Sequence, residues 1–348
     1  MVQMKSPKLW LGIAAAVLML ALAGPRVPIG TTLRPVDLPD DLDAYLAASE
    51  ARLPDLIPGT EKTILWAAEP GRQTALAIVY LHGFSATRQE TAPLADQVAG
   101  SLGANLFYMR FRGHGRGGDA LAEASVNDWL NDAWEALAIG RRLGRQVLLI
   151  GTSNGGTVAS WLAGQPGAED LFALVLISPN FGPRDAMAEV LTWPWAGTIA
   201  RMVVGREYAW TPNNERHARY WTHRYPSSAL LAMMGMVKLA RDSDLGRIRQ
   251  PLLVLYSPED QVADPRRIET AFARFGSTPK VLVAVEGSAD PQHHILAGDI
   301  LASVDTERIS ELILRFVGSL DGVPDQLVRV VTENGATLKF SSEGFEEE

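Results

Sequence analysis

The residues best suited to chemistry form a glycine-rich turn near the middle of the chain. An apolar stretch typical of a buried strand ends at Ile150, and a helix-like run begins at Thr157. Between them lies the sequence Gly151-Thr152-Ser153-Asn154-Gly155-Gly156. In this context glycines permit a strained turn that lifts the serine hydroxyl to the top of a sheet, at a helix N-terminus. The hexapeptide alone fits an ordinary turn equally well, so a nucleophilic Ser153 requires partners elsewhere.

A serine nucleophile needs a base, and position selects among the six histidines. Four of them lie early in the chain or inside an insertion: His82, His114, His217 and His223. His293 and His294 remain, and they follow the last predicted strand of the sheet. A base there gives the chain order nucleophile, acid, histidine, which distinguishes one serine-hydrolase scaffold from the others.

The third member of such a site is a carboxylate that orients the imidazole and stabilises the imidazolium. Glu259 and Asp260 follow the predicted strand that ends at Tyr256, where a side chain can reach a histidine at the end of the next strand. We predict Asp260 for this role. Glu259 and Asp264 are the alternatives, because surface loops are rich in acids.

An oxyanion formed by attack on a carbonyl requires two preorganised donors, each worth about 3 to 4 kcal/mol. The backbone N–H of Asn154, directly after the serine, is one candidate. The other is the N–H of Phe84 in the early sequence Leu81-His82-Gly83-Phe84, where Gly83 allows the turn. His82 is then a structural residue of that loop.

Strand-like and helix-like patterns alternate along most of the chain, which predicts a mostly parallel sheet flanked by helices. The predicted strands are Thr63–Ala67, Ala75–Leu81, Asn105–Arg110, Gln146–Ile150, Leu171–Ile177, Pro251–Tyr256 and Val281–Val285. The predicted helices include Arg88–Leu102, Val126–Leu143 and Thr306–Leu320. From about Gly182 to Leu245 no strand pattern appears, so this segment is interpreted as a helical insertion. It contains four of the nine tryptophans: Trp193, Trp195, Trp210 and Trp221.

Composition narrows the classes of function. The 348-residue chain has a net charge of −8 and a pI of about 5.4, so it offers no basic field for nucleic acid. It has no cysteine, which excludes a thiolate nucleophile, disulfides and cysteine-ligated zinc. The predicted chemistry requires no metal and no cofactor.

The N-terminus resembles an export signal. Lys5 and Lys8 precede an uncharged run, Leu9–Ala23, which ends in Ala-Leu-Ala before Gly24. A spanning helix needs about 20 apolar residues, so this run of about 15 favours a cleaved signal peptide over a membrane anchor. A buried helix of a cytosolic protein is disfavoured, because the run is apolar on every face. We therefore expect the rest of the chain to be exported, periplasmic or extracellular, or anchored to the inner membrane and facing outward.

Together these residues resemble the α/β-hydrolase superfamily, and in detail its monoacylglycerol-lipase-like and lysophospholipase-like serine hydrolases, over about residues 63–320. His294 followed by Ile295-Leu296 matches the family histidine, which is why His294 is preferred to His293. The sequence departs from the family pattern at two positions. Asn154 follows the nucleophile, where such lipases more often carry a bulkier or longer residue, and Arg110 replaces an acidic residue that is common before the Arg-Gly-His-Gly loop. The other matching motifs are His82-Gly83-Phe84, Arg112-Gly113-His114-Gly115, the Ser153 turn and Pro258-Glu259-Asp260-Gln261-Val262.

The resemblance implies an α/β-hydrolase fold in which the insertion, at about residues 182–245, caps the nucleophile. It also implies a serine hydrolase that cleaves a small-molecule acyl ester, and the cap tryptophans suggest either an apolar pocket or a core of the cap itself. An aminopeptidase or amidase is the alternative enzyme, for which Glu189, Glu207 and Glu215 could bind a substrate amine. A non-catalytic binding protein with this fold is the other alternative.

The expected organisation therefore has four parts. Residues 1–24 form the signal peptide or membrane anchor, and residues 25–62 form a linker and N-terminal extension. Residues 63–320 form the hydrolase domain, and residues 321–348 form a C-terminal extension with an acidic tail and a hairpin-like piece around Asn334-Gly335.

Overall fold

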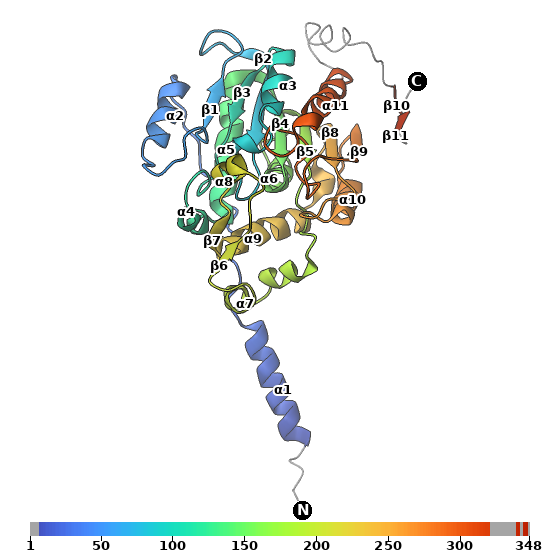
Figure 1. The fold of residues 1–348 in the computed structure, drawn as a ribbon. Helices are drawn as coiled ribbons and strands as arrows, with labels where there is room; N and C mark the ends of the chain where they lie inside the picture. Colours follow the sequence, from blue (N-terminus) through green and yellow to red (C-terminus); the bar gives the residue numbers. More distant parts are fainter. Residues whose placement is uncertain (1–6, 321–338, 342–343, 347–348) are drawn as a thin grey trace, which may run out of the picture.

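A seven-stranded sheet forms the centre of the protein in the computed structural model, which describes residues 7–320, 339–341 and 344–346 (Figure 1). The strand order is β1-β3-β2-β4-β5-β8-β9, and every neighbouring pair is parallel except β1 with β3. The predicted mostly parallel α/β sheet is thus confirmed. Its strands are β1 (Thr63–Leu65), β2 (Thr74–Leu81), β3 (Asn105–Tyr108), β4 (Gly144–Thr152), β5 (Leu171–Ile177), β8 (Leu252–Tyr256) and β9 (Lys280–Ala284).

Helices cover both faces of the sheet, because strand side chains point alternately to opposite sides. One core contains Ala77, Val79 and Leu81 of β2 together with residues of α5 (Val126–Leu143) and α6 (Asn154–Ala163). The other contains Leu76, Ile78 and Tyr80 of β2 together with residues of α3 (Leu94–Leu102) and α11 (Thr306–Gly318). The remaining helices of the main body are α2 (Leu42–Glu50), α4 (Gly118–Glu123) and α10 (Pro265–Arg274).

Local sequence signals explain where α5 and α3 begin. Ser125 and Asp128 form a reciprocal capping box that starts α5 where periodicity predicted it. The helix predicted over residues 88–102 is instead divided into a 3₁₀ turn, η1 (Arg88–Glu90), and α3. Pro93 lies at the junction, where it lacks an N–H to donate and disfavours a helical conformation of the residue before it.

The insertion between β5 and β8 is largely helical, as predicted, and lies at the end of the molecule from which α1 emerges (Figure 1). It contains η2 (Ala186–Thr192), α7 (Ala196–Val203), α8 (Glu215–Tyr220) and α9 (Ala229–Asp242), and η3 (Leu245–Arg247) follows it. It also contains an antiparallel pair of strands, β6 (Glu207–Ala209) with β7 (Arg224–Pro226). The expectation of no strand was therefore wrong, because three-residue strands are too short to produce an alternating pattern.

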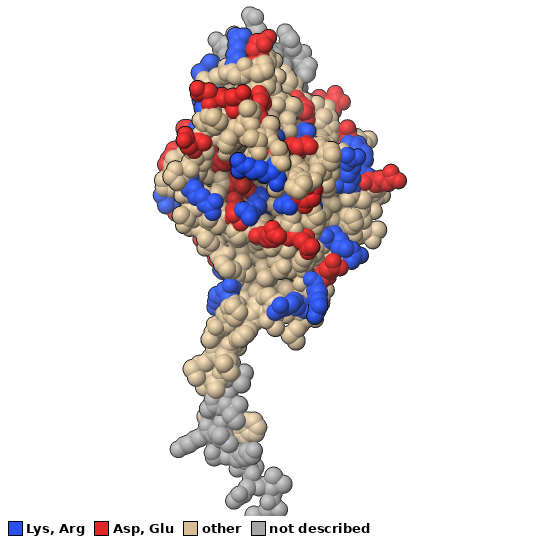
Figure 2. Space-filling view, turned by 90° about the vertical axis from the view of Figure 1, so that its left-hand side faces the viewer, with Lys and Arg blue, Asp and Glu red and all other residues tan. Residues whose placement is uncertain are grey.

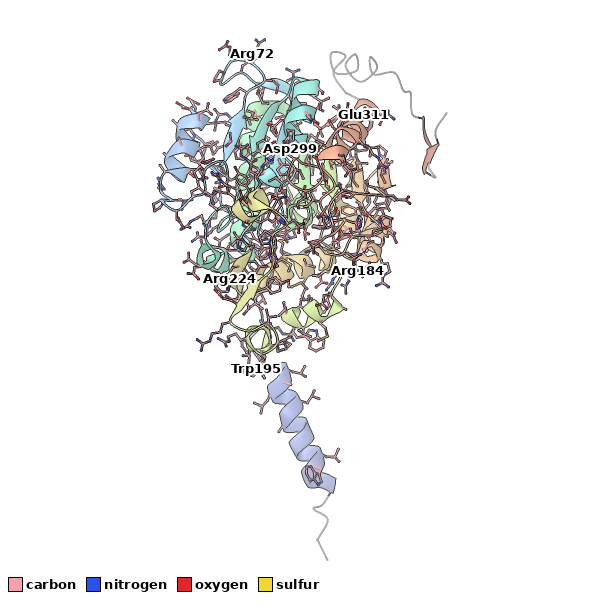
Figure 3. All side chains as sticks on the ribbon, in the orientation of Figure 1. Arg72, Arg184, Trp195, Arg224, Asp299 and Glu311 are labelled. Carbon is pink, nitrogen blue, oxygen red and sulfur yellow. The ribbon has the colours of Figure 1, made fainter. Side chains whose placement is uncertain are left out.

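The N-terminal part of the chain forms an isolated helix, α1 (Pro7–Leu22), that projects from the cap (Figure 1). The C-terminal end of α1 contacts Trp195, which precedes α7 (Figure 3). The Trp195 indole Nε1–H donates to the Leu20 carbonyl (3.0 Å), and the Trp195 backbone N–H donates to the Pro25 carbonyl (2.8 Å). Within the described ranges, no helix combines the length and the apolar character that a membrane crossing requires.

The segment between α1 and α2 is fastened to the main body. Asn131 on α5 accepts a hydrogen bond from the Arg34 N–H (2.8 Å) and donates one to the Thr32 carbonyl (3.0 Å). Arg142, at the end of α5, donates to the carbonyls of Leu38 and Pro39. The proline-rich stretch therefore follows the surface of α5.

Only a small part of the C-terminal extension belongs to the described residues. Strands β10 (Lys339–Ser341) and β11 (Gly344–Glu346) pair antiparallel. The predicted turn at Asn334-Gly335 lies outside the described residues.

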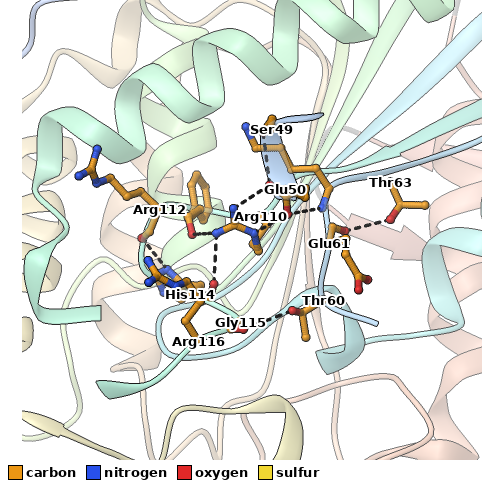
Figure 4. A network of polar contacts seen from close by, with 12 residues as sticks. Ser49, Glu50, Thr60, Glu61, Thr63, Arg110, Arg112, His114, Gly115 and Arg116 are labelled. Atoms are coloured by element: carbon orange, nitrogen blue, oxygen red, sulfur yellow. Dashed lines mark hydrogen bonds and ion pairs between the residues drawn. The ribbon is translucent and has the colours of Figure 1, made fainter. Parts of the chain in front are cut away.

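A buried ion pair joins α2 to the loop after β3 and accounts for the unusual Arg110 (Figure 4). The guanidinium donates two hydrogen bonds to the Glu50 carboxylate, both of 2.7 Å, and a third to the His114 carbonyl (3.2 Å). Burial raises the pKa of Glu50, but the hydrogen bonds and charge of Arg110 outweigh burial and hold that pKa below its ordinary value.

Glu50→Ala should lower the free energy of unfolding by about 3 to 5 kcal/mol at pH 7, because it leaves a buried guanidinium unpaired. Urea denaturation measures the change. The exposed pair Arg224–Glu207 is the matched control, and Glu207→Ala should change stability by less than about 1 kcal/mol. Because the folded-state pKa of Glu50 is depressed, its contribution should be present above the unfolded-state pKa and fade as pH falls through the folded value. Equal losses in the two variants would contradict this prediction.

Candidate functional site

Ser153 lies at a sharp turn between β4 and α6, with φ 51° and ψ −118°. A positive φ is strained for a residue with a side chain, so the surroundings must hold it. The Ser153 N–H donates to the Ile177 carbonyl (2.8 Å), and the Ser153 carbonyl accepts from the Asn180 N–H (3.1 Å). Glycine is required on both sides: a Cβ on Gly151 would lie 2.7 Å from the Gly155 carbonyl oxygen, and one on Gly155 would lie 2.1 Å from the Leu81 oxygen.

Three predicted side chains meet at one edge of the sheet. His294 Nε2 lies 2.9 Å from Ser153 Oγ, and His294 Nδ1 lies 2.7 Å from Asp260 Oδ2. They meet because Ser153, Asp260 and His294 follow the carboxyl ends of β4, β8 and β9, which are parallel. A serine, an imidazole and a carboxylate joined in this order are equipped for nucleophilic attack by the hydroxyl.

Backbone contacts orient the acid and the imidazole. Asp260 is fully buried, and its Oδ1 accepts the N–H groups of Val262 (2.7 Å) and Ala263 (2.9 Å), which leaves Oδ2 for the imidazole. The His294 carbonyl accepts a hydrogen bond from the Ser178 hydroxyl (2.7 Å), and its N–H donates to Asp290 Oδ2 (3.0 Å). The backbone of His294 is therefore fixed at both its carbonyl and its N–H, while Asp260 holds the ring.

The alternatives considered for acid and base lie elsewhere. His293, with φ 52°, has its Nδ1 3.8 Å from the exposed Glu259 carboxylate. Asp264 caps α10 by accepting from the Arg266 N–H (3.1 Å) and pairs with the Arg266 side chain. Neither His293 nor these two acids take part in the chain of hydrogen bonds that starts at Ser153.

The loop after β2 brings Gly83, the residue before Phe84, beside Ser153: a Cβ on Gly83 would lie 3.1 Å from Ser153 Cβ. His82 fixes this loop: Nε2 accepts the Phe111 N–H (3.1 Å), so Nδ1 carries the proton and donates to the Gly83 carbonyl (2.9 Å). Burial lowers the pKa of His82 to about 4, which keeps the ring neutral. Across the described ranges, neither the Phe84 N–H nor the Asn154 N–H has an acceptor within the protein. Both are therefore free to bind an oxyanion.

The cap tryptophans divide into two pairs. Trp210 and Trp221 pack in a small cluster with Ala86 of the loop after β2 and with Ile295, which follows His294. Trp193 and Trp195 are exposed. Apolar residues of the cap thus pack against Ile295, the residue that follows His294.

The three cap acids do not form a cluster for a substrate amine. Glu189 binds both Arg241 (2.7 and 2.9 Å) and Arg267 (2.7 Å), and Glu207 binds Arg224 (2.9 Å; Arg224 is labelled in Figure 3). The hydrogen bond from Arg241 holds the pKa of Glu189 below its ordinary value. Glu215 is exposed in the first turn of α8.

Sequence reasoning missed two buried acids beside this site, Asp290 and Glu90. Asp290 accepts the N–H groups of Gln292, His294 and Ile295 and so shapes the turn that carries the imidazole. The sequence does contain a signal for the role of Asp290: an Asp-Pro pair, which favours a turn, begins four residues before His294. Glu90 had no comparable signal, because it sits inside a stretch that was interpreted as an amphipathic helix.

The parallel sheet, together with the meeting of Ser153, Asp260 and His294 at the carboxyl ends of its strands, defines the chain as an α/β-hydrolase. A family model described as "Serine aminopeptidase, S33" matches residues 72–296. The chain therefore belongs to this family.

Known proteins confirm the resemblance to the monoacylglycerol-lipase branch. A "Thermostable monoacylglycerol lipase" from Bacillus sp. (strain H-257) is 24% identical over 259 residues, covering 73% of this chain and 98% of the relative. A structure titled for two metagenome-derived lipolytic enzymes, LipS and LipT, has a TM-score of 0.62 at 23% identity and covers 75% of this chain and 98% of its own. The Paleococcus ferrophilus monoacylglycerol lipase has a TM-score of 0.53 at 17% identity, with coverage of 74% and 99%.

The environment of His294 predicts a measurable titration. Burial lowers the pKa of His294, but the charge and hydrogen bond of Asp260, with help from the charge of Asp290, raise it by more, so the net shift is upward from 6.5. NMR titration should therefore give a midpoint above 6.5. In Asp260→Asn the midpoint should fall below 6.5, because burial remains while the closest negative charge is lost. His82, with a pKa of about 4 set first by burial, is the internal control and should not change. Identical His294 midpoints in both proteins would refute this account.

Proposed function

We propose that the chain is a serine hydrolase that cleaves carboxylic esters through an acyl-enzyme. The observation that carries the proposal is the pair of contacts that links Ser153 to His294 and His294 to Asp260. Serine hydroxyls are weak nucleophiles at neutral pH, and a hydrogen-bonded imidazole with a carboxylate partner is what activates them.

In the proposed mechanism, Ser153 Oγ attacks the ester carbonyl while His294 Nε2 takes its proton. The Asp260 carboxylate orients the imidazole and stabilises the imidazolium. The N–H groups of Phe84 and Asn154 bind the oxyanion of the tetrahedral intermediate. His294 then protonates the leaving alcohol, and a water molecule, activated by the same imidazole, releases the acid. These steps use no metal and no cofactor.

An ester is favoured over an aminopeptidase substrate, although the family model carries an aminopeptidase name. An aminopeptidase needs a free carboxylate for the substrate α-amine, and the partners of Glu189 and Glu207 are arginines. The named relative is a monoacylglycerol lipase, and a solved lipolytic structure is similar. We therefore propose an acylglycerol, a lysophospholipid or a simple carboxylic ester as the small-molecule substrate. Charges of both signs are interspersed over the face shown in Figure 2, consistent with a substrate other than nucleic acid.

We also propose that the chain is exported and that α1 is either a cleaved signal peptide or an anchor that associates the protein with the membrane. Exposed apolar side chains on α1 lie at the same end of the molecule as those of the cap. The cap residues are Met187, Trp193, Trp195, Met202 and Val203. Both elements at this end of the molecule thus expose apolar side chains, with Arg201 and Arg206 exposed beside those of the cap.

A fluorophosphonate probe should label the native protein, and Ser153→Ala should abolish labelling without unfolding it. Removal of a triad serine typically lowers kcat by about 10⁶-fold, so ester hydrolysis should disappear with the label. Folded wild-type protein that takes up no probe would favour the non-catalytic binding protein instead.

With the same two proteins, p-nitrophenyl esters should be hydrolysed by the wild type and aminoacyl p-nitroanilides should not. The reverse preference would favour the aminopeptidase.

Expression of the full chain in a bacterium, followed by fractionation and N-terminal sequencing, tests export. A signal peptide should give exported protein that starts at or near Gly24, whereas an anchor should give intact protein in the membrane fraction. Residues 25–348 after an initiating methionine serve as the control and should stay in the cytoplasm. Intact full-length protein in the cytoplasm would contradict the proposed export.

A further inference from the structure

A second carboxyl group lies buried directly behind the loop that carries Phe84. Glu90 ends η1, and the residue is only 1% exposed. Its Oε1 accepts the Gly83 N–H at 2.7 Å and the Tyr80 hydroxyl at 2.9 Å. The carboxyl therefore binds the residue immediately before one of the two proposed oxyanion donors.

The Tyr80 hydroxyl extends this contact to the nucleophile strand. It lies 2.9 Å from the Thr152 hydroxyl and accepts a hydrogen bond from the Thr91 hydroxyl (2.7 Å). Thr152 is the last residue of β4 and directly precedes Ser153. One buried network thus joins the two chain segments that supply the N–H groups of Phe84 and Asn154.

Gly83 fits tightly between this carboxyl and the nucleophile. A Cβ on Gly83 would lie 2.8 Å from Glu90 Oε2 and 3.1 Å from Ser153 Cβ. Position 83 therefore has no room for a side chain, because the Glu90 carboxyl and Ser153 both border the space that it would occupy.

We propose that Glu90 is a positioning residue for the oxyanion hole: its carboxyl group holds the Gly83 amide, and hence the Phe84 N–H, in place relative to Ser153 and Asn154. The inference rests on the proposed function and extends it to a residue that touches neither substrate nor the reacting atoms.

The protonation state of Glu90 follows from its surroundings. Burial raises the pKa of Glu90 to about 8, although the Gly83 N–H, the Tyr80 hydroxyl and the charge of His294 partly oppose the rise. The titratable groups that face it are Tyr80 from β2 and His294 from the loop after β9. Gly298 packs against the Glu90 backbone, where a Cβ would lie 2.7 Å from the Glu90 carbonyl oxygen, and the neighbouring Asp299 is exposed. At pH 7 the carboxyl is thus mostly neutral, and ionisation at higher pH places a negative charge next to the Gly83 N–H, one residue before the proposed oxyanion donor of Phe84.

The test compares Glu90→Gln and Glu90→Ala with wild type in steady-state ester hydrolysis from pH 6 to 10. Glutamine keeps the acceptor for the Gly83 N–H and cannot ionise, so kcat at pH 7 should stay within about threefold of wild type. The wild-type loss of kcat/KM centred near pH 8 should be absent from this variant. Alanine removes the acceptor, so kcat should fall by about 10²-fold, as when an oxyanion donor is lost, with little change in KM.

Gln89→Ala is the matched control, because Gln89 belongs to the same turn but its amide binds the Gly59 carbonyl (2.8 Å). It should retain the kcat and the pH profile of the wild type. If Glu90→Ala does not fold, Glu90→Gln still decides: an alkaline limb identical to that of wild type overturns the assignment.

Two outcomes separate this inference from the proposed function. The role of Glu90 alone is overturned if the wild type hydrolyses esters through Ser153 and the Glu90 variants keep the kcat and the pH profile of the wild type. Wild-type protein that hydrolyses no ester and takes up no probe overturns the proposed function and the Glu90 assignment with it.

Discussion

The site depends on one strained residue, Ser153, held at positive φ between a strand and a helix. Such a conformation persists only where neighbouring structure determines it from several sides. Here the N–H of Ser153 is bound by β5, its carbonyl accepts from Asn180, and the glycines on either side let α6 approach the strands within distances that exclude any side chain. The parallel order of β4, β8 and β9 then brings an acid and an imidazole to the same edge, because their carboxyl ends coincide.

Three buried carboxyl groups around this edge are stabilised in three different ways. Glu50 faces the Arg110 guanidinium, which carries the opposite charge and donates one hydrogen bond to each carboxylate oxygen. Asp260 accepts two backbone N–H groups and contacts the imidazole. Glu90 meets only a neutral amide and a hydroxyl at short range, and its pKa rises to about 8, first because of burial. Burial is tolerated in each case because the carboxyl is either paired or neutral.

Much of the fold was predictable from sequence, since the central strands are apolar runs of five to nine residues between clear turn signals. The three-residue strands β6 and β7 were not predictable, because they are too short for a period to register. Ser153, Asp260 and His294 were found as candidates, but only the family motif separated His294 from His293. Glu90, Asp290 and the Glu50–Arg110 pair were missed, because their partners are backbone groups or residues up to 60 positions away, which a pattern along the chain cannot reveal.

The stretch between α1 and α2 has a mechanical consequence. A proline-rich linker is an extended, semi-rigid spacer even where it makes no contact with a folded domain. Here Asn131 and Arg142 clamp it along α5, and Trp195 grips it where α1 ends. Contacts at both ends of this stretch therefore limit how far α1 can swing relative to the cap and to α5.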